Sequence, residues 1–305
     1  MRNAFIRALT EAAGRDERIM LLTADLGYKI FDDFARRYPG RCMNVGVAEA
    51  NMASVASGLA MEGRKPFIYS IVPFATLRAY EQIRNDICYH RADVTVVGVG
   101  GGFSYGPNGP THHSLEDIGA MRLLPHMTVV CPGDPVETTA AVHALATNRG
   151  PAYLRLGRAG EPLVHTEPVS IRLGEGIQLR AGNDVALLST GNMLGAAVST
   201  ADLLGARGIQ CRVVSLVTVK PIDVAMVEAA ARETRLVGTI EEHFRTGGLG
   251  GAVAELLADL GTPVRLRRFG VADQFAHLCG DQSYHREANG LTPPQMALAI
   301  EEALQ

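Results

Sequence analysis

The feature that most constrains this chain is a regular alternation of short β-rich runs with helical segments, which occurs twice along the sequence. In the first half, runs such as 19–23, 65–70 and 95–99 alternate with helical segments such as 48–61 and 135–146. Strands separated by helices in this way form parallel sheets that are covered by helices on both faces. The sequence therefore predicts an α/β fold.

A polar, proline-containing stretch interrupts the alternation, and the pattern restarts at Asp184. We predict a first domain with a parallel sheet over residues 1–160, a linker over 161–180 and a second α/β domain over 181–305. The 305 residues are enough for two cores, because single hydrophobic cores stop growing at about 250–300 residues. Two consecutive α/β domains are expected.

Composition excludes several classes of function. Hydrophobic residues make up 47% of the chain, charged residues 20%, and the net charge is -3, which gives no reason to expect nucleic-acid or membrane binding. No apolar run approaches the roughly 20 residues of a transmembrane helix, and the first residues do not resemble a signal peptide, so we expect a cytoplasmic protein. The five cysteines lack CxxC spacing and are predicted to be reduced thiols.

The first of three polar clusters reads Asn-Val-Gly-Val-Ala-Glu-Ala-Asn-Met over residues 44–52. It places Glu49 directly after a predicted strand and at the start of a predicted helix, where α/β sheets commonly build sites. The helix dipole also favours an acidic residue in the first turn without any further function. Position alone leaves both interpretations of Glu49 open, and the dipole is the simpler one.

The second cluster contains Phe74, Leu77 and Tyr80, spaced three residues apart on what could be one face of a helix. A stripe of core residues explains this spacing, and for Leu77 it is the better explanation. For Phe74 the alternative is an aromatic ring that stacks on a flat heterocycle.

The third cluster is a Gly/Pro-rich loop over residues 106–117, which follows a glycine-rich stretch at 98–102. That stretch lacks the GxGxxG spacing of a dinucleotide site. The loop's adjacent histidines, His112 and His113, are not expected to bind a metal, because neighbouring side chains rarely converge on one ion. A loop constrained by Gly and Pro can hold His112 towards a substrate, and we expect His113 to face away.

In this order, the three clusters resemble the motifs G-[IV]-x-E-x-N-M, F-x-x-F-x-x-Y and D-G-x-T-H of the pyrimidine-binding domain of transketolases. Close relatives of that family are deoxyxylulose-phosphate synthase and the beta subunits of 2-oxoacid dehydrogenases. The segments DVALLSTG, VVSLVTVKPID, EEHFRTGGLG and GLTPPQM resemble the family's C-terminal domain. The resemblance covers essentially the whole chain. It implies a thiamine-diphosphate-dependent transferase that moves a two-carbon ketol unit from a ketose to an aldose.

The resemblance also implies roles for individual residues. Glu49 corresponds to the glutamate that hydrogen-bonds the aminopyrimidine ring of thiamine diphosphate and so activates the cofactor. Phe74 corresponds to the aromatic residue that stacks on this ring, Tyr80 to a tyrosine near its amino group, and Asp25 to an aspartate close to the cofactor. His112 corresponds to a histidine that stabilises oxygen atoms of the reacting sugar.

The sequence departs from the family pattern at several positions of the site. Leu77 replaces a second aromatic residue of the cofactor pocket, and Asn108 replaces an aspartate that contacts a substrate hydroxyl. Glycines at 100–102 stand where full-length transketolases hold a sugar phosphate with a histidine and a serine. Arg155 and Arg158 could bind an anion instead, but ion pairs at the surface or between domains explain them equally well. Whether the substrates are phosphorylated stays open.

The family's Gly-Asp-Gly motif, which holds Mg²⁺ and the diphosphate, does not occur in this sequence. Because a hard cation that bridges phosphates needs oxygen ligands, we expect them to come from a separate N-terminal, diphosphate-binding transketolase subunit, and we predict no metal ligands in this chain. The position of Met1 just before the pyrimidine-type domain also favours a split enzyme.

Transketolase active sites lie at an interface, so we predict that this chain self-associates into a dimer within an α2β2 assembly. The small residues of segment 48–61 would permit close helix–helix contact in that interface, or they would simply pack against the sheet.

Two alternative functions are considered. The first is a beta-type subunit of another thiamine enzyme, either a 2-oxoacid dehydrogenase or an acyloin synthase of the deoxyxylulose-phosphate-synthase type. The second is a non-catalytic regulatory paralogue. The retained Glu49, Phe74 and His112 argue against the second, because a degenerate copy would have no need of them.

Overall fold

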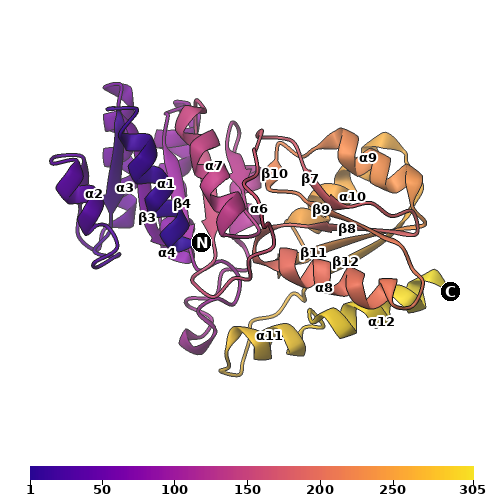
Figure 1. The fold of residues 1–305 in the computed structure, drawn as a ribbon. Helices are drawn as coiled ribbons and strands as arrows, with labels where there is room; N and C mark the ends of the chain where they lie inside the picture. Colours follow the sequence, from indigo (N-terminus) through magenta and orange to yellow (C-terminus); the bar gives the residue numbers. More distant parts are fainter.

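The computed structural model describes residues 1–305 and contains two helix-covered sheets, one formed mainly by each half of the chain (Figure 1). The N-terminal half surrounds a seven-stranded sheet and the C-terminal half a five-stranded sheet. The predicted α/β class and its two consecutive units are confirmed. None of the helices combines the length and the apolar character that a bilayer crossing requires.

The first sheet has the strand order β10-β5-β6-β4-β3-β1-β2, and all its strands except β10 run parallel. Its strands are β1 (Ile19–Thr23), β2 (Cys42–Asn44), β3 (Lys65–Ile71), β4 (Thr95–Val99), β5 (Thr128–Val130), β6 (Ala152–Leu156) and β10 (Thr218–Lys220). The helices of this half are α1 (Arg2–Ala13), α2 (Asp32–Arg37), α3 (Glu49–Met61), α4 (Val72–Ala75), α5 (Tyr80–Gln82), α6 (Asp117–Leu123) and α7 (Pro135–Thr147).

The second sheet has the order β12-β11-β8-β9-β7, with only β7 antiparallel to its neighbour. Its strands are β7 (Ile177–Arg180), β8 (Val185–Ser189), β9 (Cys211–Ser215), β11 (Leu236–Phe244) and β12 (Arg265–Val271). The helices of this half are α8 (Leu194–Gly205), α9 (Val224–Glu233), α10 (Leu249–Leu260), α11 (Gln282–Ala288) and α12 (Pro293–Leu304).

The sequence analysis missed several short elements, of which β6 and β10 matter most for the architecture. Strand β6 contains Arg155 in an otherwise apolar run, and a charged residue hides a fully buried strand from pattern analysis. Strand β10 belongs to the C-terminal half of the chain but pairs antiparallel with β5, with Thr218 opposite Val130. The first sheet is therefore completed by a segment from the other half.

The segment of the second cluster, expected to present one helix face, is also different in the structure. It ends in the single turn α5, which is followed by a π-helix over Ile83–Tyr89. Phe74 lies in α4 and Tyr80 in α5, and Leu77 lies in the turn between them, so the three-residue spacing of the second cluster does not describe one helix stripe.

One hydrophobic core cluster joins the two halves. It contains Met121 and Leu124 from the N-terminal half together with Val219, Leu249 and Val253 from the C-terminal half. Burial of apolar side chains from both sheets in one cluster resists their separation. The two units therefore pack as one body around α6, α10 and β10.

Candidate functional site

The carboxyl ends of β1, β3 and β4 meet at one edge of the first sheet, because these strands are parallel neighbours. The segments that follow β1, β2, β3 and β4 carry Asp25, Glu49, Phe74 and His112, respectively. Sites in α/β proteins form at this edge, in crevices outside the strand ends. The topology therefore gathers most of the predicted site residues at one edge.

Glu49 is the first residue of α3, and its side chain is almost fully buried, with 2% exposed. Its carboxylate accepts one hydrogen bond from Ser70 Oγ at 3.2 Å and one from Arg78 Nη1 at 2.8 Å. Ser70 lies near the end of β3, so the carboxylate is fixed between a helix start and a strand end. The helix dipole alone does not require this burial, which normally costs free energy unless the charge is paired.

Arg78 connects Glu49 to a row of aromatic rings. Its guanidinium carbon lies 4.3 Å from the centroid of the Phe74 ring, and the Phe74 and His112 rings lie 5.3 Å apart at an interplanar angle of 74°. The row continues to Tyr105, whose ring lies 6.2 Å from that of His112 and 4.9 Å from the guanidinium carbon of Arg158. Residues 49, 78, 74, 112, 105 and 158 thus form one continuous series of contacts.

His112 is half-buried on the loop after β4, and its Nδ1 lies 3.0 Å from the hydroxyl oxygen of Thr111. Asn108 is exposed on the short 3-10 turn Gly106–Asn108 of the same loop. The left-handed backbone of Gly109, with φ 77°, allows the chain to reverse between these two residues. The loop therefore presents Asn108 and His112 from one short segment.

His113, the next residue, points the other way. It is buried, its Nε2 lies 3.0 Å from the backbone oxygen of Gly106, and its ring packs against Phe103 and His285 at 5.1 Å and 5.0 Å. His285 belongs to α11 in the C-terminal half. The expectation that His113 faces away from the site is confirmed.

Asp25 lies at the end of β1 in a left-handed backbone conformation with φ 54°, which is uncommon for a residue with a side chain. Its N–H donates to Asn44 Oδ1 at 2.9 Å, and Asn44 Nδ2 donates back to the Asp25 carboxylate at 3.0 Å. The Tyr28 hydroxyl donates to the same carboxylate at 3.2 Å, and this hydrogen bond raises the pKa of Tyr28. Sequence reasoning missed Asn44, although it opens the first cluster.

Tyr80 and Leu77 do not lie beside Phe74 on a common helix face. The Tyr80 hydroxyl donates to the backbone oxygen of Ala120 at 2.9 Å, and burial raises the pKa of this tyrosine. Leu77 is 44% exposed, so the interpretation of Leu77 as a core residue is wrong. Its exposed position is compatible with the wall of a pocket.

Arg155 is only 3% exposed, and its guanidinium forms hydrogen bonds within the protein through Nε and Nη2. It pairs with Asp117 at 2.7 Å and donates to the backbone oxygens of Ser114 at 2.8 Å and Glu242 at 3.0 Å. Burial disfavours the charge, but the Asp117 carboxylate outweighs this effect and raises the pKa of Arg155. Arg155 therefore pairs with Asp117 inside the N-terminal half and bonds to the C-terminal half through the backbone oxygen of Glu242, which corrects its assignment to substrate. Arg158 remains exposed.

Two residues that contact Glu49 escaped sequence reasoning. Ser70 is one of many residues in a buried strand, and Arg78 stands inside the second cluster without a family role to mark it. The only sequence signal was the location of Arg78 two residues before Tyr80, which says nothing about a partner 29 positions earlier. No group of three or more His, Cys, Asp or Glu side chains is arranged to hold a metal ion.

The arrangement fits an aminopyrimidine ring. Such a ring needs a carboxyl group to hydrogen-bond a ring nitrogen and an aromatic face on which to stack, and Glu49 and Phe74 supply these groups on the two sides of Arg78. Arg78 is 47% exposed, so its side chain can leave both groups without disturbing the core.

Comparison with known protein families matches both halves of the chain. The family described as Transketolase, pyrimidine binding domain, matches residues 1–160, and the family described as Transketolase, C-terminal domain, matches residues 174–295.

Relatives of similar length are named as transketolase subunits. A 6-deoxy-6-sulfo-D-fructose transketolase subunit from Clostridium sp. (strain MSTE9) is 39% identical over 306 residues, which cover 100% of this chain and 94% of the relative. An apulose-4-phosphate transketolase subunit from Phocaeicola vulgatus is 36% identical over 275 residues, covering 90% and 88%. A 1-deoxy-D-xylulose-5-phosphate synthase from Heliobacterium modesticaldum is 35% identical, but only 46% of it is covered.

Solved structures show the same relationship. A split-gene transketolase, described as an inactive beta4 tetramer, superposes with a TM-score of 0.92 at 38% identity and covers 99% of this chain and 97% of its own. A transketolase from Pichia stipitis superposes with a TM-score of 0.82 at 21% identity, with 45% of its length covered, which shows the shared fold.

Proposed function

The chain belongs to the transketolase family, and we propose that it builds one side of the active site of a two-component transketolase that transfers a two-carbon ketol unit. A second subunit would supply the other side. The observation that carries this proposal is the buried carboxylate of Glu49 next to the Phe74 ring at the open edge of the first sheet.

Thiamine diphosphate, when bound, supplies the carbanion-stabilising chemistry that ketol transfer requires. The part of this chain is to hold the pyrimidine end. The Glu49 carboxyl group would share a proton with a ring nitrogen, with Ser70 fixing its orientation, and the Phe74 ring would support one face. Tyr80, Asp25 and Leu77 stay proposed as neighbours of the cofactor.

His112 is proposed to contact the oxygen atoms of the reacting sugar. Its ring is held against Phe74, so it lies beside the position proposed for the cofactor. A preorganised donor at this position stabilises charge that develops on oxygen in the transition state. Asn108, on the same loop, is proposed to contact a substrate hydroxyl.

The names of two relatives include a sulfonated sugar and a sugar phosphate, both of which carry an anionic group. We propose a substrate with such a group for this chain as well. Arg155 is buried in its ion pair with Asp117 and is not accessible to a substrate. Arg158 is exposed at the end of the aromatic row, so we propose that it binds the anionic group. Guanidinium groups bind phosphate and similar oxyanions through paired hydrogen bonds.

Mg²⁺ and the diphosphate end of the cofactor are proposed to bind mainly to the partner subunit. Relatives that this chain covers almost completely are themselves named as subunits, which supports a second chain. The two subunits would form an α2β2 assembly around a two-fold axis.

Helix α3 is proposed to contribute to self-association of this chain. Its small residues fall on two faces: Ala53 and Ala56 are buried against the sheet, whereas Ser54 and Gly58 are exposed, and a Cβ at Gly58 would have open space around it. The buried face accounts for the packing alternative, and the exposed face is free for a second copy. Light scattering of the isolated chain tests this: a strict monomer at micromolar concentration contradicts it.

The central experiment is reconstitution. The chain is purified alone and together with the product of the adjacent reading frame, and each preparation is supplied with thiamine diphosphate and Mg²⁺. We expect ketol transfer only with both chains, and a preference for ketose donors with a phosphate or sulfonate over neutral ones. Pyruvate with an aldehyde acceptor is the matched test for acyloin synthesis, and activity there alone would replace the proposal.

Calorimetry on the isolated chain tests the division of the cofactor site. We expect weak or no binding of thiamine diphosphate, since this chain is proposed to hold only the pyrimidine end. Tight, Mg²⁺-dependent binding to this chain alone would contradict the two-component model.

A further inference from the structure

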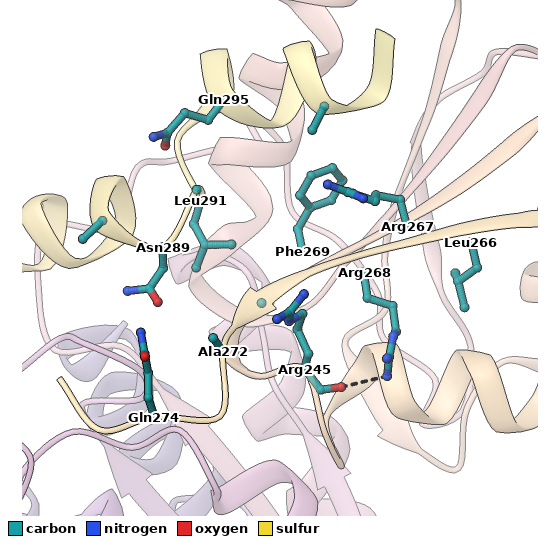
Figure 2. Close-up of a pocket in the computed structure, with 14 residues that line it drawn as sticks. Arg245, Leu266, Arg267, Arg268, Phe269, Ala272, Gln274, Asn289, Leu291 and Gln295 are labelled. Carbon is teal, nitrogen blue, oxygen red and sulfur yellow. Dashed lines mark hydrogen bonds between the residues drawn. The ribbon is translucent and has the colours of Figure 1, made fainter. Parts of the chain in front are cut away.

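The C-terminal half contains a cavity of about 480 Å³ that the proposed function does not use (Figure 2). It lies between the ends of β11 and β12 on one side and the α11–α12 connection on the other. All its lining residues fall between positions 245 and 299, so nothing from the first sheet reaches it. Its volume is within the range of about 300–1,000 Å³ of small-molecule pockets.

All the charged side chains that line the cavity are positive. Arg245, Arg267 and Arg268 line the cavity, together with amide side chains and apolar groups but no acidic residue. The chain as a whole carries a net charge of -3, so this concentration of positive charge does not reflect its average composition.

The three arginines also lack the carboxylate partners that other arginines of this half possess. Arg286, for example, pairs with Glu242, whereas no ion pair involves Arg245, Arg267 or Arg268. Their charges are therefore available for a ligand, because nothing in the protein neutralises them.

The geometry holds these groups together. Arg268 Nη1 donates to the backbone oxygen of Arg245 at 3.0 Å, a contact drawn in Figure 2, and this bond ties the Arg268 side chain to the segment that carries Arg245. The guanidinium carbon of Arg267 lies 6.0 Å from the centroid of the Phe269 ring. Strand β12 is the edge strand of its sheet, so its side chains reach the cavity from both faces.

The wall opposite the arginines adds amide and apolar side chains to the site. Figure 2 shows the amide groups of Gln274 and Asn289 close to each other on the side of the cavity away from Arg267 and Arg268, with Leu291 and Phe269 between this side and Arg267. Asn289 Nδ2 donates a hydrogen bond to the backbone oxygen of His285 at 2.8 Å, which fixes the side chain. The Asn289 Oδ1 takes no part in this bond. Arginines and amides can bind the oxygens of a ligand, and the apolar groups can contact its carbon skeleton.

We propose that this cavity binds the phosphate group of a small phosphorylated metabolite. A phosphate monoester carries up to two negative charges and several acceptor oxygens, and each guanidinium presents five N–H donors in a planar fork. A monocarboxylate carries one charge and two oxygens and would leave more of this positive charge unmatched. The site is separate from the edge that carries Glu49 and does not depend on the proposed catalytic function.

The test is binding to the full-length chain alone, without cofactor or partner. Inorganic phosphate, glucose 6-phosphate and glucose are titrated by calorimetry at constant ionic strength, with chloride as the reference anion. We expect saturable binding of both phosphate compounds and none of glucose. Tighter binding of glucose 6-phosphate than of inorganic phosphate would indicate that the apolar wall contributes to the affinity. Equal affinities would show that the site recognises the phosphate group alone.

Variants assign the binding to this cavity. Arg245→Gln and Arg268→Gln should each weaken phosphate binding by about tenfold or more, because each removes a charge-assisted contact. Arg149→Gln is the matched control, since it removes the same charge from an exposed position that forms no ion pair. This control should bind phosphate as the unmodified chain does.

Two results would overturn the proposal. One is that phosphate has no more effect than chloride at equal ionic strength. The other is that Arg149→Gln weakens binding as much as Arg245→Gln, which would place the anion elsewhere or make it a general charge effect. The side chains of Arg149, Arg245 and Arg268 are exposed, and equal melting temperatures without phosphate verify that the variants fold.

Discussion

His112 and His113 are neighbours in sequence but belong to two regions of opposite character. His112 lies at the open edge, the surface formed by Glu49, Phe74, Arg78 and His112. His113 lies in the buried cluster between the two halves, which contains Phe103, His113, Ser114, Asp117, Arg155, Glu242 and His285. Both regions contain charged and aromatic groups, so residue type alone does not distinguish them.

The difference lies in how each charge is partnered. In the buried cluster, Arg155 contacts Asp117 and two backbone oxygens, and Glu242 accepts from the Phe103 N–H at 2.6 Å and from Gln282 at 2.8 Å. At the open edge, Glu49 depends on a single half-exposed arginine for its charge partner. A buried charge with several internal partners stabilises the fold, whereas one held by a movable side chain is available for a ligand.

The largest expected effect is at the open edge. Glu49→Gln keeps the shape of the side chain but removes the carboxyl proton, so turnover of the assembled enzyme should fall by about 10²–10⁴-fold. The melting temperature of the chain should change little, because the amide oxygen can still accept from Arg78 while the amide N–H donates to the Ser70 hydroxyl. Steady-state rates and thermal denaturation measure the two quantities, and a variant within a few-fold of the unmodified rate would place the proton transfer elsewhere.

The buried cluster should respond in the opposite way. Arg155→Met leaves the Asp117 carboxylate buried without its partner, which should lower the free energy of unfolding by about 3–5 kcal/mol. Chemical denaturation measures this loss. The double variant Arg155→Met/Asp117→Leu is the control: it removes both charges and should recover part of the stability. If the single variant were as stable as the unmodified chain, the pair would not contribute to the stability of the fold.

Adjacent histidines allow a matched comparison. His112→Ala should lower kcat by about 10²-fold with little change in stability, because it removes a group next to the reacting atoms. His113→Ala should instead lower the free energy of unfolding by about 1–3 kcal/mol. It leaves the backbone oxygen of Gly106 without its hydrogen-bond partner and creates a cavity beside Phe103. Equal effects of the two substitutions on kcat would show that the loop acts as a structural unit.

A smaller effect should appear with pH in the buried cluster. Burial, and then the neighbouring His113, lowers the pKa of His285 below its ordinary value near 6.5, against the opposing influence of the Gly106 backbone, Glu242 and Asp281. Because the unfolded chain then binds more protons than the folded one, stability should decrease as the pH falls below about 6.5. The ring nitrogens His113 Nδ1 and His285 Nε2 are buried and form no hydrogen bond in the folded chain.

Thermal denaturation between pH 7.5 and 5.5 is the measurement. His285→Gln should flatten the decrease in melting temperature on acidification, and His90→Gln, at an exposed position, should not. An unchanged slope in His285→Gln would assign the pH dependence to other groups.

The sequence predicted the architecture because its signals are local. The alternation of strands and helices can be recognised from short stretches of sequence. It was sufficient to predict the α/β class and most of the strands. The polar clusters around Glu49, Phe74 and His112 follow strands in sequence, and the rule that parallel strand ends meet at one edge was enough to gather them there.

What the sequence could not predict was the partner of each side chain. Arg155 and Arg158 are three residues apart and of the same type, yet only Arg155 lies in a strand that faces the other half of the molecule. Likewise, the spacing of Phe74, Leu77 and Tyr80 suggested one helix face, whereas the break between α4 and α5 turns them in different directions.

The sequence by itself therefore determined the fold class, the family and the residues that meet at the open edge. Only the tertiary structure decided that Arg78 pairs with Glu49, that Arg155 pairs with Asp117, and that β10 completes the first sheet. Periodicity and motifs are properties of short stretches of chain. These pairings instead depend on contacts between residues far apart in sequence, and on which polar groups are removed from water when the two halves pack.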